Sequence, residues 1–365
     1  CALPISRLAL IWLVGLVSKY EMKISSAVQG GNIDNMELEM YMSVFSLEYS
    51  PCGNYLCCGD NYGRVNIFMV KNLLSSTEVG NSSKITPHAS FSAHSSGVYS
   101  MVSSNSFLIT GSVNEINAWS WDDLIKNKLG KLSWSINLPS DNYNYEKPEV
   151  NAMVIDQNKL FTACGDGLVY VFDLENGQLI RELKGFTDCA HCVSVRNNKC
   201  VAGSEDGSVR LWDIRKSDEI NRVEPYKDPK LSRPKIGKWI SCIDSTEDWM
   251  VCGGGPSLAL WHMRSFTPTL VLPPNDSVVY AALFSEDKIV SAGGTSMVYG
   301  TYLDGSRSSE IPASSNCVYT VKMANVVNKV LSFGGTSNKV DLSFNMNYRD
   351  FVLPVPCSRA HIIKS

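Results

Sequence analysis

The sequence predicts an all-β fold, a seven-bladed β-propeller, because one strand-rich unit recurs along most of its 365 residues. One pattern appears seven times from about residue 43 onward. It consists of an apolar strand, a small residue followed by Gly, a turn, and a strand that ends in an aromatic residue. The recurring Gly lies at positions 38 to 54 residues apart, namely Gly59, Gly111, Gly165, Gly203, Gly253, Gly293 and Gly334. Repeats of about 40 to 45 residues are typical of propeller blades.

The residue types within each copy account for its strands and its turn. Asp166-Gly167 and Asp206-Gly207 are the clearest turns, since a tight hairpin favours residues that accept a positive φ. A four-stranded sheet cannot bury both faces alone, so the copies must stack radially as one domain. We expect the aromatic residue that closes each third strand to fill the space between blades: Phe68, Trp119, Phe172, Trp212, Trp261, Tyr302 and Phe344.

A fourth, outer strand is expected in every copy, for example at 90–92 and 178–181. The last outer strand is predicted at 349–352, in which case the ring closes without borrowing an N-terminal strand. Two polar insertions, 74–87 and 141–148, read as surface loops.

The ends of the chain fall outside the repeat. We interpret 1–41 as an N-terminal extension that is either disordered or foreign to the native protein, whose start would then be Met22, Met36 or Met40. The apolar run at 8–17 is too short to span a bilayer as a helix. The propeller is assigned to 42–353 and a C-terminal tail to 354–365.

Composition narrows the classes of function. A net charge of -3 argues against binding nucleic acid by phosphate neutralisation alone. Five of the twelve cysteines lie in short apolar runs and read as buried thiols of a reducing compartment: Cys57, Cys58, Cys164, Cys200 and Cys252. Cys189 and Cys192 flank His191, but no second ligand pair lies at zinc-site spacing, so no metal is predicted.

No catalytic constellation is found, so the chain is predicted not to be an enzyme and to use no cofactor. The glycine-rich stretch 253–256 lies in a strand-to-strand turn, whereas a phosphate loop needs a following helix. Glu205 and Asp206 are adjacent on one turn, while paired catalytic carboxylates come from separate elements.

The fourth copy, 203–213, matches the WD40 signature best, and the propeller is therefore identified as WD40-type. Ser204, Asp206 and Trp212 take three of the four places of the WD40 hydrogen-bond network, and Asp213 completes the Trp-Asp pair. The usual His is replaced by Phe186. The second copy keeps His94 and Trp119 but loses the turn Asp, so apolar packing should hold this propeller more than such networks do.

One stretch resembles a narrower family. Ser232-Arg233-Pro234, Gly237-Lys238-Trp239-Ile240, the run 248–256 and Leu260-Trp261-His262 resemble the fifth blade of the THO complex subunit 6 family. Ser50-Pro51-Cys52-Gly53, Asn61-Tyr62-Gly63 and Ala93-His94 look like its first two blades. The resemblance extends from Met42 to about Val352, and Phe186 departs from it.

The resemblance implies a non-catalytic scaffold subunit of the nuclear THO core of the TREX assembly, which couples transcription and splicing to mRNA export. The implied partners are other THO core subunits, especially coiled-coil ones, and a higher-order THO oligomer. RNA contact would be indirect at most, and no membrane is involved. Other adaptor roles, such as substrate reception for a ubiquitin ligase, remain open.

Candidate docking residues are Arg233, Lys238, Trp239 and His262, since Arg and Trp are favoured interface anchors. The alternatives are that Trp239 covers a blade and that Arg233 orders a loop. Tyr143 and Tyr145 are weaker candidates. Direct RNA contact would use the one dense basic cluster, formed by Lys227, Lys230, Arg233, Lys235 and Lys238.

Overall fold

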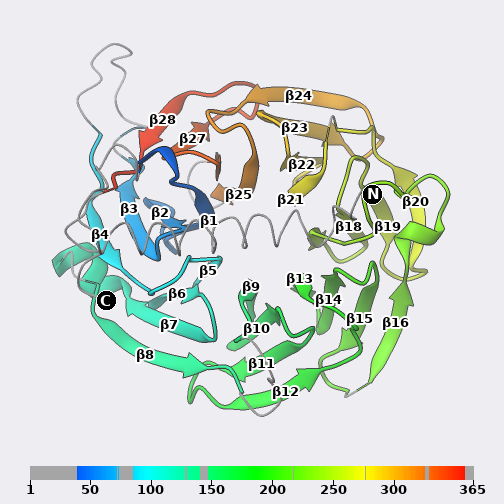
Figure 1. Cartoon of the computed structure of the whole chain (residues 1–365), viewed down its shortest axis with the longest axis horizontal. Coiled ribbons are helices and arrows are strands. Elements are labelled where there is room, and N and C mark those ends of the chain that lie inside the picture. The colour runs from blue at the N-terminus through cyan, green and yellow to red at the C-terminus, as the bar shows by residue number, and fades with distance from the viewer. Residues whose placement is uncertain are drawn as a thin grey trace, which may run out of the picture.

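The computed structural model describes residues 39–71, 73, 85–127, 130–139, 147–216, 218–275, 277–324 and 329–357. These residues form seven four-stranded antiparallel sheets arranged in a ring (Figure 1), and the inner strands line a central channel. The sheets are numbered here as blades 1 to 7 in chain order. In every blade the four strands are consecutive in the sequence, with the first strand beside the channel and the fourth at the rim. The predicted seven-bladed propeller is confirmed.

The strands have the following bounds. Blade 1 consists of β1 (Val44–Tyr49), β2 (Tyr55–Asp60), β3 (Arg64–Met69) and β4 (Ala89–Ser92). Blade 2 consists of β5 (Ser100–Ser103), β6 (Phe107–Gly111), β7 (Glu115–Ser120) and β8 (Leu132–Asn137). Blade 3 consists of β9 (Val150–Asp156), β10 (Lys159–Cys164), β11 (Val169–Asp173) and β12 (Leu179–Leu183). Blade 4 consists of β13 (Ala190–Arg196), β14 (Lys199–Ser204), β15 (Val209–Asp213) and β16 (Glu219–Val223).

Blade 5 consists of β17 (Cys242–Ser245), β18 (Trp249–Gly253), β19 (Ala259–His262) and β20 (Thr267–Val271). Blade 6 consists of β21 (Val279–Ser285), β22 (Lys288–Gly293), β23 (Met297–Tyr302) and β24 (Arg307–Pro312). Blade 7 consists of β25 (Val318–Ala324), β26 (Val330–Gly335), β27 (Lys339–Ser343) and β28 (Phe351–Pro354). Two short helical turns, Asp123–Asn127 and Pro225–Lys227, lie between strands.

Alternation of the strands gives the ring two faces. The upper face carries the connections between blades and the turns between second and third strands, and the lower face carries the other turns within blades. Upper-face turns include Asp166-Gly167 and Asp206-Gly207, where Gly167 and Gly207 have φ values of 80° and 83°. Any other residue would be strained at these positive φ values, as the sequence pattern predicted.

The core lies between neighbouring blades, as radial stacking predicted. The contact between blades 4 and 5, for example, buries Val201 and Leu211 of one blade against Met250 and Trp261 of the next. Five of the aromatic residues at the ends of third strands are buried, namely Phe68, Trp119, Phe172, Trp212 and Trp261. Tyr302 and Phe344 are half-buried.

Inner strands are also linked by hydrogen bonds that the sequence did not reveal. At five successive contacts, a side chain near the start of one inner strand donates to a backbone carbonyl at the start of the next. The pairs are Ser46 Oγ to Val98 O (2.8 Å), Ser100 Oγ to Val150 O (2.8 Å), Asn151 Nδ2 to Ala190 O (2.8 Å), Cys192 Sγ to Ile240 O (3.6 Å) and Ser241 Oγ to Val279 O. These bonds fix the relative height of blades 1 to 6 around the channel.

Side chains close the ring between blades 7 and 1. Lys322 Nζ on β25 donates to Glu48 Oε2 on β1 over 2.6 Å, and Tyr49 Oη donates to Val330 O over 3.3 Å. β28 overlaps the strand predicted at 349–352, so blade 7 is built from its own four strands. The packed chain continues past Leu353, because Val355 and Cys357 are buried against blade 1.

The predicted extension at 1–41 lies almost entirely outside the described residues, which begin at residue 39, and Met42 is already buried in blade 1. The apolar run at 8–17 and most of both predicted loops, including Tyr143 and Tyr145, also lie outside them. The five cysteines expected in the core are buried free thiols. Across the described residues, no helix has the length and apolarity needed to span a membrane.

Candidate protein-interaction surfaces

The connection 225–240 brings three of the four predicted docking residues together on the upper face of blades 4 and 5. The Arg233 guanidinium lies over the Trp239 ring, 4.6 Å from its centroid. Arg233 Nη1 donates to the carbonyls of Gly254 (2.8 Å) and Gly255 (2.9 Å), and Nη2 donates to the carbonyl of Trp239. Burial lowers the pKa of Arg233 to about 10, so the group is still charged at neutral pH.

This geometry gives Arg233 and Trp239 a structural role. Trp239 is 2% exposed and has no ring face to offer a partner. Three donor positions of Arg233 are already used by carbonyls of the same chain, which ties 225–240 to the turn 253–256 of blade 5. Both residues fit the alternative interpretations better than a role as exposed anchors. Trp239 covers a blade, and Arg233 orders a loop.

Lys238 and His262 lie on different faces. Lys238 is exposed on the upper face, with its Nζ 5.2 Å from the centre of the Tyr226 ring. His262 ends β19 on the lower face, where its ring packs edge-on against Trp249 at 5.4 Å. The structure therefore does not unite the four predicted docking residues in one surface.

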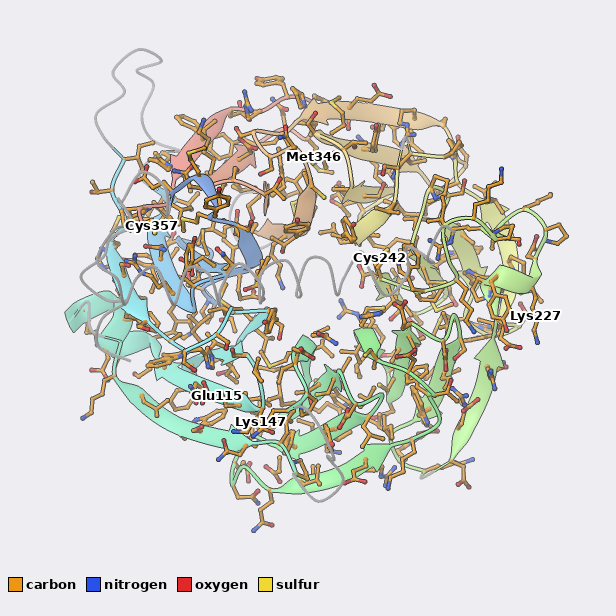
Figure 2. The ribbon with its side chains drawn as sticks, viewed as in Figure 1. Glu115, Lys147, Lys227, Cys242, Met346 and Cys357 are labelled. Carbon is orange, nitrogen blue, oxygen red and sulfur yellow. The ribbon has the colours of Figure 1, made fainter. Side chains whose placement is uncertain are left out.

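The basic cluster is also divided. Lys227 lies at the outer edge of the molecule (Figure 2), where it pairs with Glu224 over 2.5 Å. Arg233 donates to the carbonyls of Gly254 and Gly255 of the same chain. Lys230, Lys235 and Lys238 are exposed and take part in none of the ion pairs found among the described residues. Three separate lysines form a weaker electrostatic surface than the five cations of the sequence suggest.

The structural network predicted from His94 and Trp119 is present in blade 2. His94 is buried, with Nδ1 2.5 Å from Glu115 Oε1 and Nε2 2.7 Å from Thr110 Oγ1. Thr110 Oγ1 in turn accepts from Trp119 Nε1 over 3.0 Å. Glu115 replaces the missing turn Asp, and its hydrogen bond from His94 holds the pKa of Glu115 below its usual value.

Blade 4 does not contain the hydrogen-bond network that the sequence predicted for Ser204 and Trp212. Ser204 Oγ donates to the carbonyl of Asp188 over 3.0 Å and accepts from the amide of Asp206, so it stabilises the turn and is not a partner of Trp212. The position that matches Thr110 in strand register is Ala202, which has no hydroxyl. Phe186 packs edge-on against Trp212 at 5.7 Å where a His would otherwise stand. An aromatic contact has replaced the polar network.

Asp206 and Asp213 hold backbone and side-chain donors near these turns. Partial burial acts to raise the pKa of Asp206, but hydrogen bonds from Ser208 and the Thr187 amide keep it below its ordinary value. Asp213 Oδ2 pairs with Arg215 Nη2 over 2.7 Å. Both carboxylates therefore have structural partners.

The sequence analysis missed Thr110 and Glu115, the hydrogen-bond partners of His94 and Trp119 in blade 2. A search of the second copy for groups that could complete the network of His94 and Trp119 could have revealed them.

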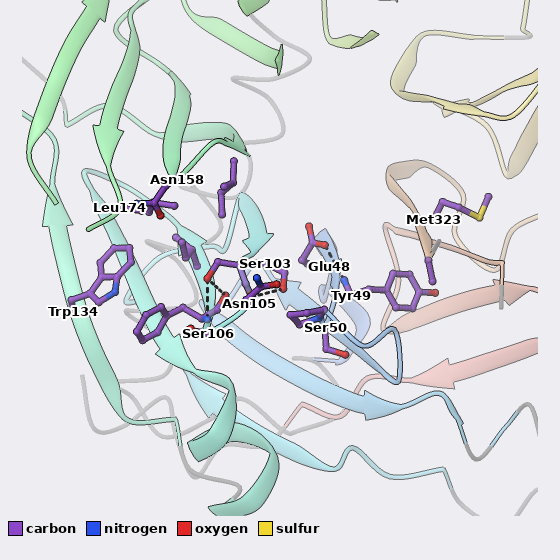
Figure 3. A pocket seen from close by; sticks show the side chains of 16 residues that line it. Glu48, Tyr49, Ser50, Ser103, Asn105, Ser106, Trp134, Asn158, Leu174 and Met323 are labelled. Carbon is purple, nitrogen blue, oxygen red and sulfur yellow. Dashed lines mark hydrogen bonds between the residues drawn. The ribbon is translucent and has the colours of Figure 1, made fainter. Parts of the chain in front are cut away.

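The lower face carries a pocket of about 710 Å³ over blades 7, 1, 2 and 3 (Figure 3). Trp134 and Leu174 lie at one end, Tyr49 and Met323 at the other, and serine and asparagine side chains lie between them. The buried carboxylate in the wall is Glu48. Burial raises its pKa, and the ion pair with Lys322 opposes this rise.

The acidic, cysteine and histidine side chains of the described residues form no candidate metal site. No three His, Cys, Asp or Glu side chains there lie close enough to hold a metal ion. Cys192 contacts the carbonyls of Gly203 and Ile240, while His191 Nε2 lies 2.9 Å from Glu205 Oε2. Thiol and imidazole are thus engaged with different groups.

Comparison with known proteins places the chain. A model of the family "WD domain, G-beta repeat" matches residues 177–213, which include the copy with the clearest signature. Human THO complex subunit 6 is 39% identical over 322 residues, which cover 86% of this chain and 93% of the human protein. The chain belongs to the THO complex subunit 6 family.

Other members of the THO complex subunit 6 family cover the same extent. The Danio rerio homolog is 39% identical over 316 residues, 85% of this chain and 96% of its own length. The Drosophila melanogaster protein is 32% identical over 314 residues, 85% of this chain and 88% of its own length. The family resemblance seen in the fifth-blade residues is confirmed along most of the chain.

Proposed function

We propose that this chain is a non-catalytic scaffold subunit of a nuclear THO complex and contributes through it to mRNA export. The observation that carries the proposal is its similarity to THO complex subunit 6 over 93% of the human protein and 96% of the Danio rerio homolog. Similarity over more than nine tenths of a relative supports a shared role more strongly than a shared repeat does, because propellers serve many functions.

The rim of the propeller supports a role in binding other proteins. Large exposed apolar side chains stand on the outer strands of three consecutive blades. They are Leu132 on β8, Leu179 and Ile180 on β12, and Ile220 on β16.

Strand register places these four residues, called the rim patch, at the same end of their blades. Leu132 pairs with Trp119, Leu179 with Phe172, and Glu219, beside Ile220, with Trp212. Large exposed apolar surfaces mark protein-interaction sites, and side chains at the same end of three neighbouring blades can be covered by one partner. We propose that the rim patch packs against the apolar face of a coiled-coil THO subunit.

Lys238 on the upper face and His262 on the lower face are proposed as secondary contacts. They would allow two neighbours to bind one propeller, as a higher-order THO oligomer requires. RNA contact is proposed to be indirect, since Arg233 and Lys227 are held by groups of this chain. The adaptor role in a ubiquitin ligase has no specific observation in its favour.

Depletion and rescue test the export role. Cells depleted of the chain are expected to retain polyadenylated RNA in the nucleus, and re-expression of the full chain should restore its export. The measurement is the nuclear-to-cytoplasmic ratio of polyadenylated RNA by in situ hybridisation. A ratio that stays unchanged after complete depletion would rule out a contribution to export.

A further inference from the structure

The upper mouth of the central channel has a distinctive lining. At least three consecutive residues of each blade line a cavity of about 280 Å³, and the first of them lies within one residue of the start of the inner strand. In chain order these first residues are Phe45, Tyr99, Asn151, His191, Ser241, Tyr280 and Tyr319. Five of them, in blades 1, 3, 4, 6 and 7, occupy β-bulges between the first and second strands. Bulges re-aim side chains and are frequent beside binding sites.

One half of the mouth is aromatic. Tyr280 and Tyr319 lie with ring centres 5.7 Å apart, Tyr319 and Phe45 5.9 Å apart, and Phe45 and Tyr99 5.7 Å apart. These four residues, called the aromatic arc, span blades 6, 7, 1 and 2 without a gap and are half-buried. The face of an aromatic ring carries negative charge density, so the arc attracts a cation.

The other half of the mouth offers hydrogen-bond acceptors. Asn151 Nδ2 and Ser241 Oγ already donate to the carbonyls of Ala190 and Val279. His191 Nε2 lies 2.9 Å from the Glu205 carboxylate, which can accept a hydrogen bond from it. In the neutral imidazole that carries its proton on Nε2, Nδ1 is an acceptor. That atom is buried and has no hydrogen-bond partner among the described residues, and the His191 side chain is 7% exposed.

The two cations near the cavity each have a carboxylate beside them, Arg233 near Glu205 and Lys322 near Glu48. Lys322 also lines the cavity, and its ammonium is paired with Glu48 over 2.6 Å. The Cys192 and Cys242 thiols lie against the carbonyls of Ile240 and Gly253. Behind the acceptor half stands the carboxylate of Glu205. A ligand for this mouth must donate hydrogen bonds on one side and offer positive charge to aromatic rings on the other.

We propose that the upper mouth of the channel binds an arginine side chain from an extended segment of a partner polypeptide. A guanidinium is planar, stacks on aromatic rings and carries several N–H donors, so it satisfies both halves at once. An ammonium is compact and strongly hydrated, and a trimethylated one has no donor for His191. The site is a property of the isolated chain and does not depend on its membership of a THO complex.

Titration of the purified full chain with short peptides tests the site. The probes are N-acetylated, C-amidated Ala-Arg-Ala and its citrulline counterpart, which keeps the shape of arginine without the charge. Isothermal titration is expected to give saturable binding of the arginine peptide at least about tenfold tighter than that of the citrulline peptide. Equal binding of the two peptides, or no saturable binding, would overturn the proposal.

Variants locate the binding. Tyr319→Leu and Tyr280→Leu each remove one ring, and His191→Leu removes the acceptor, so each should reduce the preference for arginine. Tyr348→Leu, an exposed tyrosine far from the channel at the rim, is the matched control and should keep it. Variants are compared only where thermal unfolding matches the wild type. If every folded channel variant still binds the arginine peptide as much more tightly than the citrulline peptide as the wild type does, arginine binds elsewhere and the proposed site is refuted.

Discussion

Arg233 illustrates how one side chain can order a surface segment from beneath. Its guanidinium reaches Gly254 and Gly255 across the contact between blade 4 and blade 5, and a Cβ on Gly254 would lie only 2.9 Å from the guanidinium nitrogens. Glycine at this turn therefore admits the guanidinium. The same contacts cover Trp239 and fix the course of residues 225–240.

Replacing Arg233 should cost stability more than it affects binding. Arg233→Ala removes the guanidinium donor from three carbonyls and uncovers Trp239, so the free energy of unfolding should fall by about 2–4 kcal/mol. Urea denaturation measures it. Lys235→Ala, an exposed change in the same segment, should shift it by less than about 0.5 kcal/mol. Unchanged stability in Arg233→Ala, with loss of a THO partner, would return Arg233 to the role of a docking residue.

Single residues also show the limit of prediction from the sequence. His94 and Trp119 could be paired from the sequence because their spacing follows a known repeat. Ser204 was misplaced because its role depends on strand register: Ala202, two residues earlier, faces Trp212 in the way that Thr110 faces Trp119. Arg233 was open to two interpretations, since two of its partners, Gly254 and Gly255, lie 21 and 22 residues further along the chain.

Among the elements, the strands and the upper-face turns were predictable, and the contacts between blades were not. A strand is encoded by its own alternation and a turn by its own Asp-Gly step. The bulges that direct Tyr280, Tyr319 and His191 into the channel depend on pairing between strands, which alternation does not specify. Closure was left open by the sequence and proves to rest on side chains of β1 and β25.

Lys322 should be the critical cation at the closure between blades 7 and 1. Lys322→Met leaves Glu48 buried without a counter-charge, and the free energy of unfolding should fall by about 3–5 kcal/mol at neutral pH. Because burial raises the pKa of Glu48, the stabilising effect of its protonated form is lost as pH rises. The deficit of Lys322→Met should therefore shrink as the pH is lowered.

Two comparisons check the closure in chemical denaturation. The double variant Glu48→Gln/Lys322→Met should recover part of the loss, because no buried charge remains. Lys329→Met breaks an ion pair between exposed side chains of Lys329 and Glu286 and should cost less than about 1 kcal/mol. If Lys322→Met proves as mild as Lys329→Met, closure does not depend on the buried ion pair.

At the scale of the whole molecule, the propeller joins three surfaces that face different directions. The rim patch lies on the outer strands of blades 2 to 4, the three exposed lysines lie on the upper face, and a pocket of about 710 Å³ opens on the lower face. A rigid ring with separate surfaces suits a subunit that holds several neighbours. Composition and repeats predicted the ring. The rim patch could not be predicted from them, because it depends on how the outer strands pair with the third strands.

Affinity purification of the tagged chain from RNase-treated nuclear extract, quantified by mass spectrometry, tests the THO scaffold role most directly. The account predicts that THO core subunits are recovered in stoichiometric amounts and withstand RNase. Changing the rim patch to glutamate at Leu132, Ile180 and Ile220 should release them, whereas Thr267→Glu/Thr269→Glu on the outer strand of blade 5 should not. Recovery of another complex in place of THO subunits would contradict the proposed function and leave the propeller fold intact.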